Sequence, residues 1–174
     1  LDAVNFAADY DKSVSRERVN LLNWSEEFDK SDWVQTSVTV APDVLLAPDG
    51  TLTADSTDKT IDNSAELRQV ISEQQTGAEY IFSVWLKKWN SDIVRIVIYN
   101  NNGNVFIAAN NCDLSSGEWE RFSVSGTTNA TSTSIKVIIH SYSDTTDAYT
   151  WGAQLELGSV ATDYQRVGHG EGEN

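Results

Sequence analysis

Short runs in which apolar and polar residues alternate dominate this chain, and stretches with helical spacing are hard to find. The strongest runs cover residues 79–89 and 92–99, and an Asn-rich turn at 100–104 follows the second. A period of two residues is the pattern of a strand that buries one face. Strands are also expected at 19–24, 33–40, 65–71, 105–109, 118–126, 133–142 and 148–157. About ten short strands joined by polar turns predict an all-β fold, an antiparallel β-sandwich of jelly-roll type.

The same pattern suggests how the chain is organised. Residues 1–18 are polar and lack a continuous apolar stripe, so we interpret them as a lead-in or linker from a preceding region. Residues 19–166 form the expected sandwich, and residues 167–174 a flexible, Gly-rich tail. Within the sandwich we expect a loop at 44–64, because Pro48, Asp49 and Gly50 supply turn chemistry.

The charge balance narrows the choice of partners. The chain has 26 acidic and 12 basic residues, a net charge of −14. A surface this negative repels phosphate backbones and anionic lipid, so we expect no nucleic acid partner. Membrane insertion is not expected either, since no apolar run approaches the roughly 18 residues of a membrane span. Cys112 is the only cysteine, which rules out an intrachain disulfide, and a small buried hydrophobe is its expected role.

Signatures of catalysis are missing from the sequence. It has no Ser nucleophile elbow, no P-loop and no dinucleotide-binding glycine pattern. His140 and His169 have no nearby Cys or His with which to build a zinc site. Paired carboxylates carry no weight here, because 26 acids produce such pairs by chance. We therefore expect a protein that is not an enzyme.

The outward faces of three strands carry an unexpected set of side chains. If Tyr80 and its alternate neighbours face the core, two tryptophans of the same strand face water. If the outward faces of these strands adjoin, they form an aromatic and basic patch that can stack on sugar rings and bond hydroxyls. A contact with a neighbouring subunit, or packing within the domain, explains the same patch. The candidate ligand-binding residues are Trp85, Trp89, Arg95, Tyr99, His140 and Tyr142.

The segment "YTWGAQLEL" at 149–157 is expected to be the closing strand. Strict alternation puts Tyr149, Trp151, Ala153 and Leu155 on its core side. Gly152, on the other side, allows a neighbour to approach closely.

Several segments, in order, resemble a module of bacteriophage virion proteins. They are "NLLNWSEEF", the turn "APDGTLTAD", "YIFSVWLKK", "SGEWERFSVSGT" and the closing "WGAQLELGSVATDY", and the resemblance covers residues 18 to 166. The "NLLNWSEEFDKSDW" stretch is also similar, more distantly, to the first strand of calcium-containing jelly-roll carbohydrate-binding modules. Four tryptophans match family positions and are expected in the core: Trp24, Trp33, Trp119 and Trp151.

The resemblance implies a tail fibre, tailspike or head decoration protein located in the virion. On that basis we expect a non-catalytic domain that binds host-surface glycan in an adsorption structure, with other virion subunits as partners in a homo-oligomer, a trimer being the usual state of phage fibres. The alternatives are a purely structural virion domain without a ligand and an accessory binding module of a glycan-degrading tailspike.

Calcium is the one cofactor that these patterns suggest. The carbohydrate-binding modules place an acid that helps to bind a structural ion after the Phe, which points to Asp29. Loop carboxylates suit a hard cation, and Asp32, Asp144 and Asp147 are further candidates, although solvated acids that keep the protein soluble explain all four. Gly152, Ala153 and Gln154 stand where those modules carry acids in the last strand.

Overall fold

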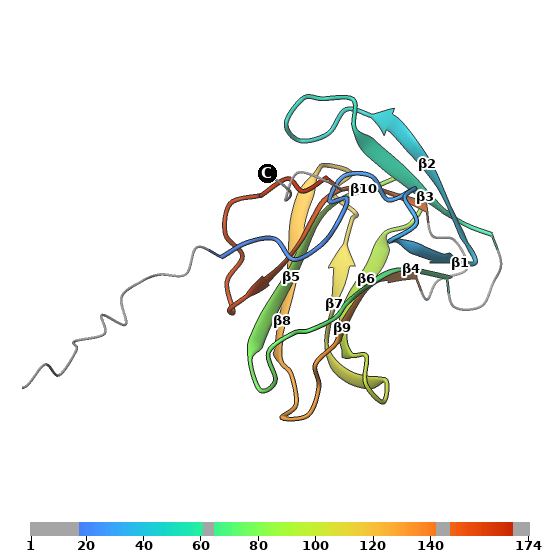
Figure 1. Cartoon of the computed structure of the whole chain (residues 1–174). Helices are drawn as coiled ribbons and strands as arrows, with labels where there is room; N and C mark the ends of the chain where they lie inside the picture. The colour runs from blue at the N-terminus through green and yellow to red at the C-terminus, as the bar shows by residue number, and fades with distance from the viewer. Residues whose placement is uncertain (1–17, 61–64, 142–146, 169–174) are drawn as a thin grey trace, which may run out of the picture.

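The computed structural model describes residues 18–60, 65–141 and 147–168, which form ten β-strands and no helix (Figure 1). Every pairing between neighbouring strands is antiparallel. Sheet A has the spatial order β1 (Val34–Thr36), β4 (Ala65–Ile71), β9 (Ile135–Ser141), β6 (Ile93–Asn100) and β7 (Val105–Asp113). Sheet B has the order β2 (Val38–Leu45), β3 (Ala54–Lys59), β10 (Asp147–Leu157), β5 (Glu79–Lys88) and β8 (Glu120–Thr127). The predicted all-β antiparallel sandwich is confirmed.

One main apolar core lies between the two sheets. It takes alternate residues from the strands, and in β5 these are Tyr80, Phe82, Val84 and Leu86, as the alternation predicts. The segment before β1 closes one end of the core, where the rings of Phe28 and Trp33 lie 4.9 Å apart. Cys112 is buried in the same core, and burial raises the pKa of its thiol to about 12. Cys112 is thus a buried hydrophobe, as expected.

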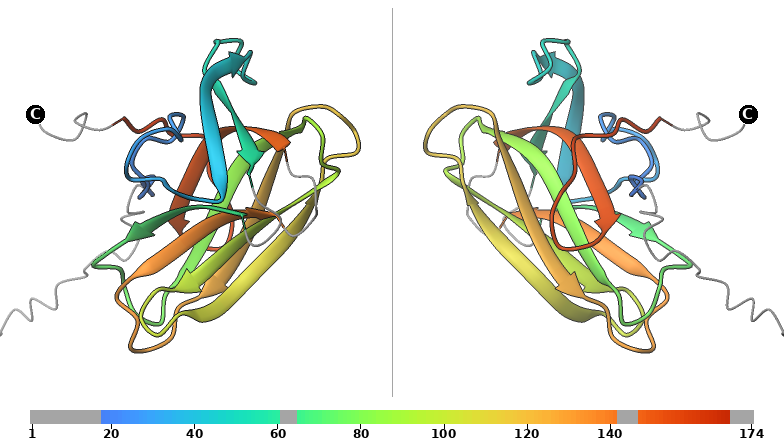
Figure 2. Two further views of the ribbon diagram at one scale, coloured as in Figure 1. Left: turned by 90° about the vertical axis from the view of Figure 1, so that its right-hand side faces the viewer. Right: turned by 90° about the vertical axis from the view of Figure 1, so that its left-hand side faces the viewer.

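Three segments differ from the elements that the sequence predicts. The run at 33–40 is divided between the two sheets, because Ser37 has a φ of 52° and ends β1 before β2 begins. The expected loop at 44–64 contains β3, a polar strand that pairs with both β2 and β10. Residues 19–24 lie outside the ten strands. Figure 2 shows the far end of the β2–β3 hairpin projecting beyond the rest of the sandwich.

A bulge in β10 corrects the expected faces of the closing strand. Gly152 has a φ of +64°, and the register of β10 against β5 shifts between Trp151 and Gln154. An extra residue at this point exchanges the two faces of the strand. Tyr149 and Trp151 therefore face outward, opposite Lys87 and Trp85, while Ala153 and Leu155 lie in the main core. The prediction that all four share the core side is wrong, because strict alternation has no bulge.

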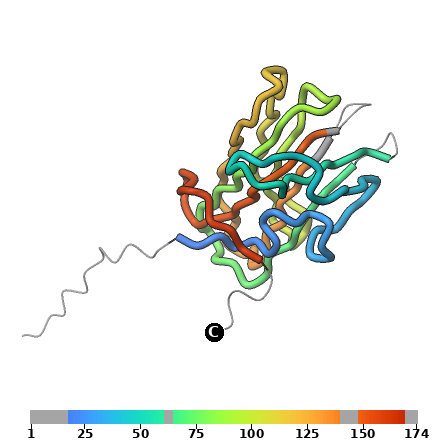
Figure 3. Tube along the Cα trace, turned by 90° about the horizontal axis from the view of Figure 1, so that it is seen from above, coloured from blue at the N-terminus to red at the C-terminus, as the bar shows by residue number. Residues whose placement is uncertain are grey.

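The first and last described segments lie side by side against β10 (Figure 3). Leu21 N–H donates to Leu155 O and Ala153 N–H donates to Ser25 O, both at 2.8 Å. On the other side of residues 18–26, Ser25 N–H donates to Val167 O at 2.8 Å. Glu26 accepts a hydrogen bond from Tyr164 Oη at 3.0 Å and pairs with Arg166 Nε at 3.1 Å. We call these contacts the terminal seam.

Candidate functional site

Strand register arranges the outward side chains of sheet A in a grid across β4, β9, β6 and β7. Residues that pair in register share a face, and rows two residues apart repeat along the strands. The first row has Glu66, His140, Arg95 and Asn111, the second Arg68, Ile138, Val97 and Ala109, and the third Val70, Lys136, Tyr99 and Phe106. We call these residues the sheet A face. The register brings Arg95, Tyr99 and the strand position of His140 to one face, as the sequence predicts.

Two aromatic rings and two cations gather at the β6–β9–β7 part of the sheet A face. Tyr99 and Phe106 meet edge to face, with ring centroids 5.6 Å apart. Arg95 Cζ lies 5.6 Å from the centre of the Phe106 ring, and Lys136 Nζ lies 4.8 Å from that of Tyr99. Phe106 is nevertheless 49% exposed. An aromatic surface is thus held in place by cation–π contacts while one ring stays open to solvent.

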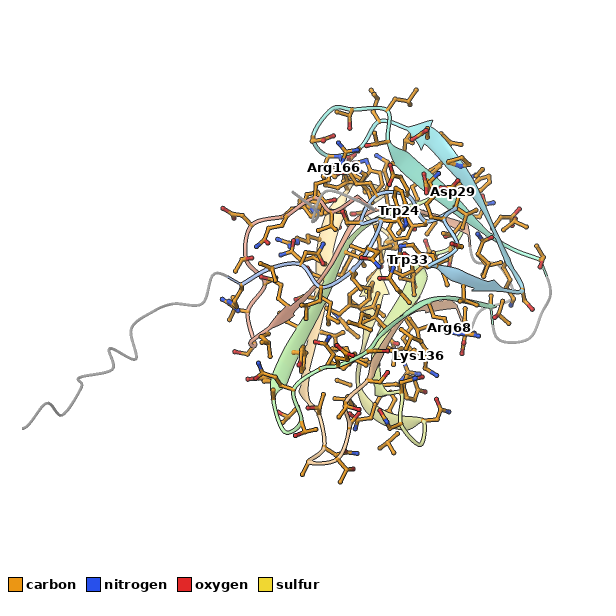
Figure 4. The ribbon with its side chains drawn as sticks, in the orientation of Figure 1. Trp24, Asp29, Trp33, Arg68, Lys136 and Arg166 are labelled. Carbon is orange, nitrogen blue, oxygen red and sulfur yellow. The ribbon has the colours of Figure 1, made fainter. Side chains whose placement is uncertain are left out.

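The middle row is apolar and covered. Ile138 is 1% exposed and Val97 3% exposed, although both point away from the core. The aliphatic parts of Arg and Lys side chains cover apolar surface of this kind while their charged groups stay in water. In β4, Arg68 Nη1 donates to Glu66 Oε2 and to Thr36 Oγ1, each at 2.9 Å. Figure 4 shows Arg68 and Lys136 on the same side of the sandwich.

Sequence reasoning missed Arg68 and Phe106 as site residues. The alternation of residues does not give the order of strands in a sheet, so it did not indicate that β4 lies beside β9 or that β7 lies beside β6. For Phe106, a signal existed in the turn at 100–104. A tight hairpin makes its two strands neighbours, and residues that follow this turn must lie beside Tyr99.

Trp85 belongs to a second apolar cluster on the outer side of sheet B. The cluster is built from Ala47, Ala54 and Trp151, with Leu45, Trp85, Trp119 and Tyr164 packed against it. Tyr164 comes from the segment after β10, and its ring lies 4.6 Å from that of Trp151. Trp85 is therefore half-buried under the chain itself, and its place in the expected patch is wrong.

The other expected aromatic residues also fall outside the sheet A face. Trp89 follows β5 of sheet B and stacks on Tyr149, with ring centroids 5.6 Å apart and an interplanar angle of 18°. It is 40% exposed, so it is open to solvent but on the opposite sheet from Arg95 and Tyr99. Tyr142 lies outside the described residues, and for His140 only the strand position is described. The expected patch is thus divided between two sheets.

The four family tryptophans are not equally buried. Trp33 is 2% exposed in the main core, and Trp151 is 3% exposed in the outer cluster of sheet B. Trp24 packs half-buried against the main core, and Trp119 does so against the outer cluster, where its Nε1 donates to Leu46 O at 3.0 Å. All four serve packing.

The surroundings of Asp29 test the calcium expectation. Asp29 Oδ2 lies 3.2 Å from Lys30 Nζ, and Asp29 Oδ1 is buried without a hydrogen bond, as is Asp32 Oδ2. In the described part of the chain, however, no three His, Cys, Asp or Glu side chains converge on a point that can hold a metal ion. Asp144 and the side chain of Asp147 lie outside the description. Calcium at Asp29 therefore stays an untested prediction.

No helix among the described residues is long and apolar enough to cross a membrane. Searches with family models and with curated proteins found no match to this chain. Solved structures do match. The enzymatically active domain of bacteriophage CBA120 tailspike protein 4 is similar, with a TM-score of 0.62 and 16% identity over 80% of this chain and 21% of that one. The fold is a jelly roll of the carbohydrate-binding-module type.

Modules of glycan-degrading enzymes share this jelly roll. The CBM22 tandem domain of Paenibacillus barcinonensis Xyn10C matches with a TM-score of 0.61 and 13% identity, over 83% of this chain and 47% of that one. The Cellvibrio mixtus lichenase 5A module CBM6cm-2, in complex with cellotriose, matches with a TM-score of 0.51 and 11% identity, over 82% and 100%. This chain therefore spans about the length of a single module and about a fifth of the tailspike chain. Identities this low establish the fold alone.

Proposed function

We propose that this jelly roll binds carbohydrate on the sheet A face, without catalysis, as the host-recognition domain of a phage adsorption structure. The observation that carries the proposal is the exposed ring of Phe106, set against Tyr99 and flanked by Arg95 and Lys136. An aromatic ring of this kind stacks on the apolar C–H face of a sugar, while guanidinium and ammonium groups bond its hydroxyls.

Two features favour the sheet A face over the rest of the surface. Its aromatic pair is anchored by cation–π contacts, which spares a ligand the cost of ordering the rings. The outer side of sheet B is already covered at Trp85 by Tyr164, although the Trp89–Tyr149 stack there is open. Asn111 and Arg95 share a row beside the aromatic pair and supply directional hydrogen-bonding groups.

The phage setting rests on different support. The five segments that resemble virion modules, and the tailspike domain with the same fold, favour a virion protein that meets a host-surface polysaccharide. We propose that the domain lies on the virion as part of a homotrimer, with other virion subunits as its neighbours. The accessory module of a glycan-degrading tailspike is a variant of this proposal in which another domain carries the chemistry.

A purely structural role is the second candidate, and the rim of the sheet A face favours it. Val34, Val70 and Ile93 lie on the outward side of sheet A and are 42%, 43% and 52% exposed. An interface with a neighbouring subunit would cover these exposed apolar side chains. In this role the same face packs against a neighbouring subunit.

A glycan array tests both candidates when the mass of the protein in solution is measured on the same sample. We expect specific binding that Phe106→Ala reduces about tenfold or more, because it removes a stacking ring. The matched control is Val105→Ala, which truncates the adjacent residue, 47% exposed, that points away from the sheet A face. Trp89→Ala tests the other open aromatic site, and we expect it to leave binding unchanged.

Two results would contradict this assignment. Glycan binding that Trp89→Ala abolishes and Phe106→Ala spares would move the site to sheet B. No glycan binding, together with a stable oligomer that Phe106→Ala dissociates, would establish the structural role instead.

A further inference from the structure

The sheet A face reverses the charge of the molecule. The whole chain carries a net charge of −14, yet the three rows of the sheet A face hold Arg68, Arg95 and Lys136 against one described carboxylate, Glu66. We propose that the ligand of this face is an acidic polysaccharide, one that carries carboxylates on its sugar rings. This inference rests on the proposed function, and it names the class of glycan.

Arg68 is prepared to receive a carboxylate. Its contacts with Glu66 and Thr36 both use Nη1, so Nη2 and Nε remain as donors for a ligand. These contacts also hold the guanidinium in one position, and a planar guanidinium edge matches the two oxygens of a carboxylate. The ion pair with Glu66 offsets only part of the cationic character of the face, because one carboxylate stands against three cations in these rows.

Lys136 and Arg95 hold their charges beside the aromatic surface. Lys136 Nζ lies over Tyr99 and donates to Asn104 Oδ1 at 2.6 Å, and Arg95 lies over Phe106. A sugar stacked on Phe106 therefore has Arg95 beside that ring and Lys136 beside the neighbouring ring of Tyr99. Neutral ligands need only the hydrogen bonds of such groups, whereas a ring carboxylate also gains from their charge.

The three cations come from three different strands, an arrangement that suits a polymer lying across the face better than a single acidic sugar. Arg95, Arg68 and Lys136 occupy three successive rows, and rows two residues apart are separated by about 7 Å along the strands. The backbone positions of the three residues thus span about 14 Å along the strands, while the charged groups of Arg95 and Lys136 both lie against the Tyr99–Phe106 pair. A chain laid across β4, β9 and β6 meets all three cations, and the acidic surface elsewhere repels it. The cations of the sheet A face thus favour an acidic ligand, and the negative charge of the remaining surface directs that ligand to this face.

The experiment compares acidic polysaccharides with their carboxyl-reduced forms, in which each uronic acid becomes a neutral sugar of the same configuration. Polygalacturonate, alginate and hyaluronate serve as probes beside the bacterial polysaccharides of the array, each in both forms, in affinity electrophoresis with the whole chain. We expect at least one acidic form to bind about tenfold or more tightly than its reduced partner, the scale of one charged hydrogen bond.

Substitutions then locate the charge effect. Arg68→Gln and Lys136→Gln keep part of each stem over the apolar row, and we expect each to weaken binding of the acidic form about tenfold while binding of the reduced form changes little. Lys87→Gln removes a half-buried cation from the outer side of sheet B and is the matched control, expected to leave binding unchanged.

The outcomes separate the two proposals. Reduced forms that bind as tightly as acidic ones, or an array that retains only neutral glycans, would overturn the acidic ligand and leave carbohydrate binding intact. An array on which neither form of any glycan binds would overturn both proposals. A loss of acidic binding in Lys87→Gln equal to that in Lys136→Gln would also refute the assignment to the sheet A face.

Discussion

Asp55 is a buried carboxyl group at the junction of the two sheets and the segment before β1. It is 1% exposed, and its two oxygens accept backbone N–H groups from Phe28 at 2.8 Å and Asp43 at 3.0 Å. Burial raises the pKa of Asp55 to about 7 and outweighs the two backbone hydrogen bonds, which lower the pKa, while the nearby charges of Asp29 and Asp43 raise it slightly further. The folded protein thus binds a proton here that the unfolded chain, with an ordinary pKa of 3.8, releases.

The free energy of unfolding is expected to depend on pH through Asp55. Because the folded pKa is raised, the contribution of this group is complete below about pH 4 and is lost as pH rises through about 7, a total of at most about 4 kcal/mol. Asp55→Asn removes the titration, so its free energy of unfolding should vary less between pH 4 and 7. Denaturant titrations at a series of pH values measure this slope.

Asp113→Asn is the control for the pH prediction. Hydrogen bonds from Ser115 lower the pKa of this exposed carboxyl group below 3.8, so it stays ionised above pH 5 in both states and its loss leaves the slope between pH 5 and 7 unchanged. Asn at position 55 also keeps only one acceptor for two N–H groups, so Asp55→Asn should be less stable at pH 4. A slope equal to that of the original protein would contradict the role given to Asp55.

The packing of aromatic residues on the outer side of sheet B depends on the bulge in β10. At Gly152 the chain takes a φ of +64°, and a Cβ there would lie 3.1 Å from Trp85 Cδ1 and 3.3 Å from Tyr164 Cε2. The bulge turns Trp151 outward, where its Nε1 donates to Thr53 Oγ1 at 2.9 Å. Trp85, Trp151 and Tyr164 can pack together only because residue 152 has no side chain.

Gly152→Ala should destabilise the domain through two separable effects. The left-handed conformation costs roughly 1 kcal/mol for a residue with a Cβ, and displacing the packed rings costs about 1–3 kcal/mol more. Gly117→Ala isolates the first effect, since Gly117 has a φ of +72° and no atom within 4 Å of the added Cβ. Equal losses in the free energy of unfolding for the two variants would show that the close packing at Gly152 carries no energy.

Prediction from the sequence succeeded where the pattern of residues within one strand determines its structure. The range 65–71 agrees with β4 at both ends, and alternation gave the core side of β5 correctly. The prediction failed where contacts with other strands determine whether a segment forms a strand. The polar β3 is a strand because β2 and β10 pair with both of its edges and because its buried Asp55 and Thr57 find hydrogen-bond partners.

The candidate site was likewise predicted correctly within single strands and wrongly across them. Alternation gave the outward positions of Arg95 and Tyr99 in β6, which the register confirms. It could not say that β5 and β6, neighbours in sequence, belong to different sheets, and so it joined Trp85 and Trp89 to them. A connection of a few residues between two strands allows a hairpin or a crossing between sheets, and only the packing of the whole chain distinguishes them.

At the scale of the whole molecule, repulsion among acidic groups opposes folding. A net charge of −14 on a compact domain raises the free energy of the folded state relative to the expanded chain. Raising NaCl from about 10 mM to 300 mM shortens the Debye length from about 30 Å to less than 8 Å. We therefore expect the free energy of unfolding at pH 7 to rise by about 1 kcal/mol in denaturant titrations.

The control for the salt effect is a lower pH. Near pH 4.3 the net charge of the chain approaches zero, and the stabilisation by salt should disappear. Stability that falls with salt at pH 7 would mean that attractive ion pairs such as Glu26–Arg166 outweigh the general repulsion.

The terminal seam determines how the domain responds to mechanical load. Residues 18–26 and 164–167 run next to each other, so a pull on the two ends acts first on Ser25–Val167 and Glu26–Arg166. The bonds of Leu21 to Leu155 and of Ser25 to Ala153 pass part of this load to β10 of sheet B. In a chain that is stretched between two anchored bodies, the seam would open first and lengthen the connection.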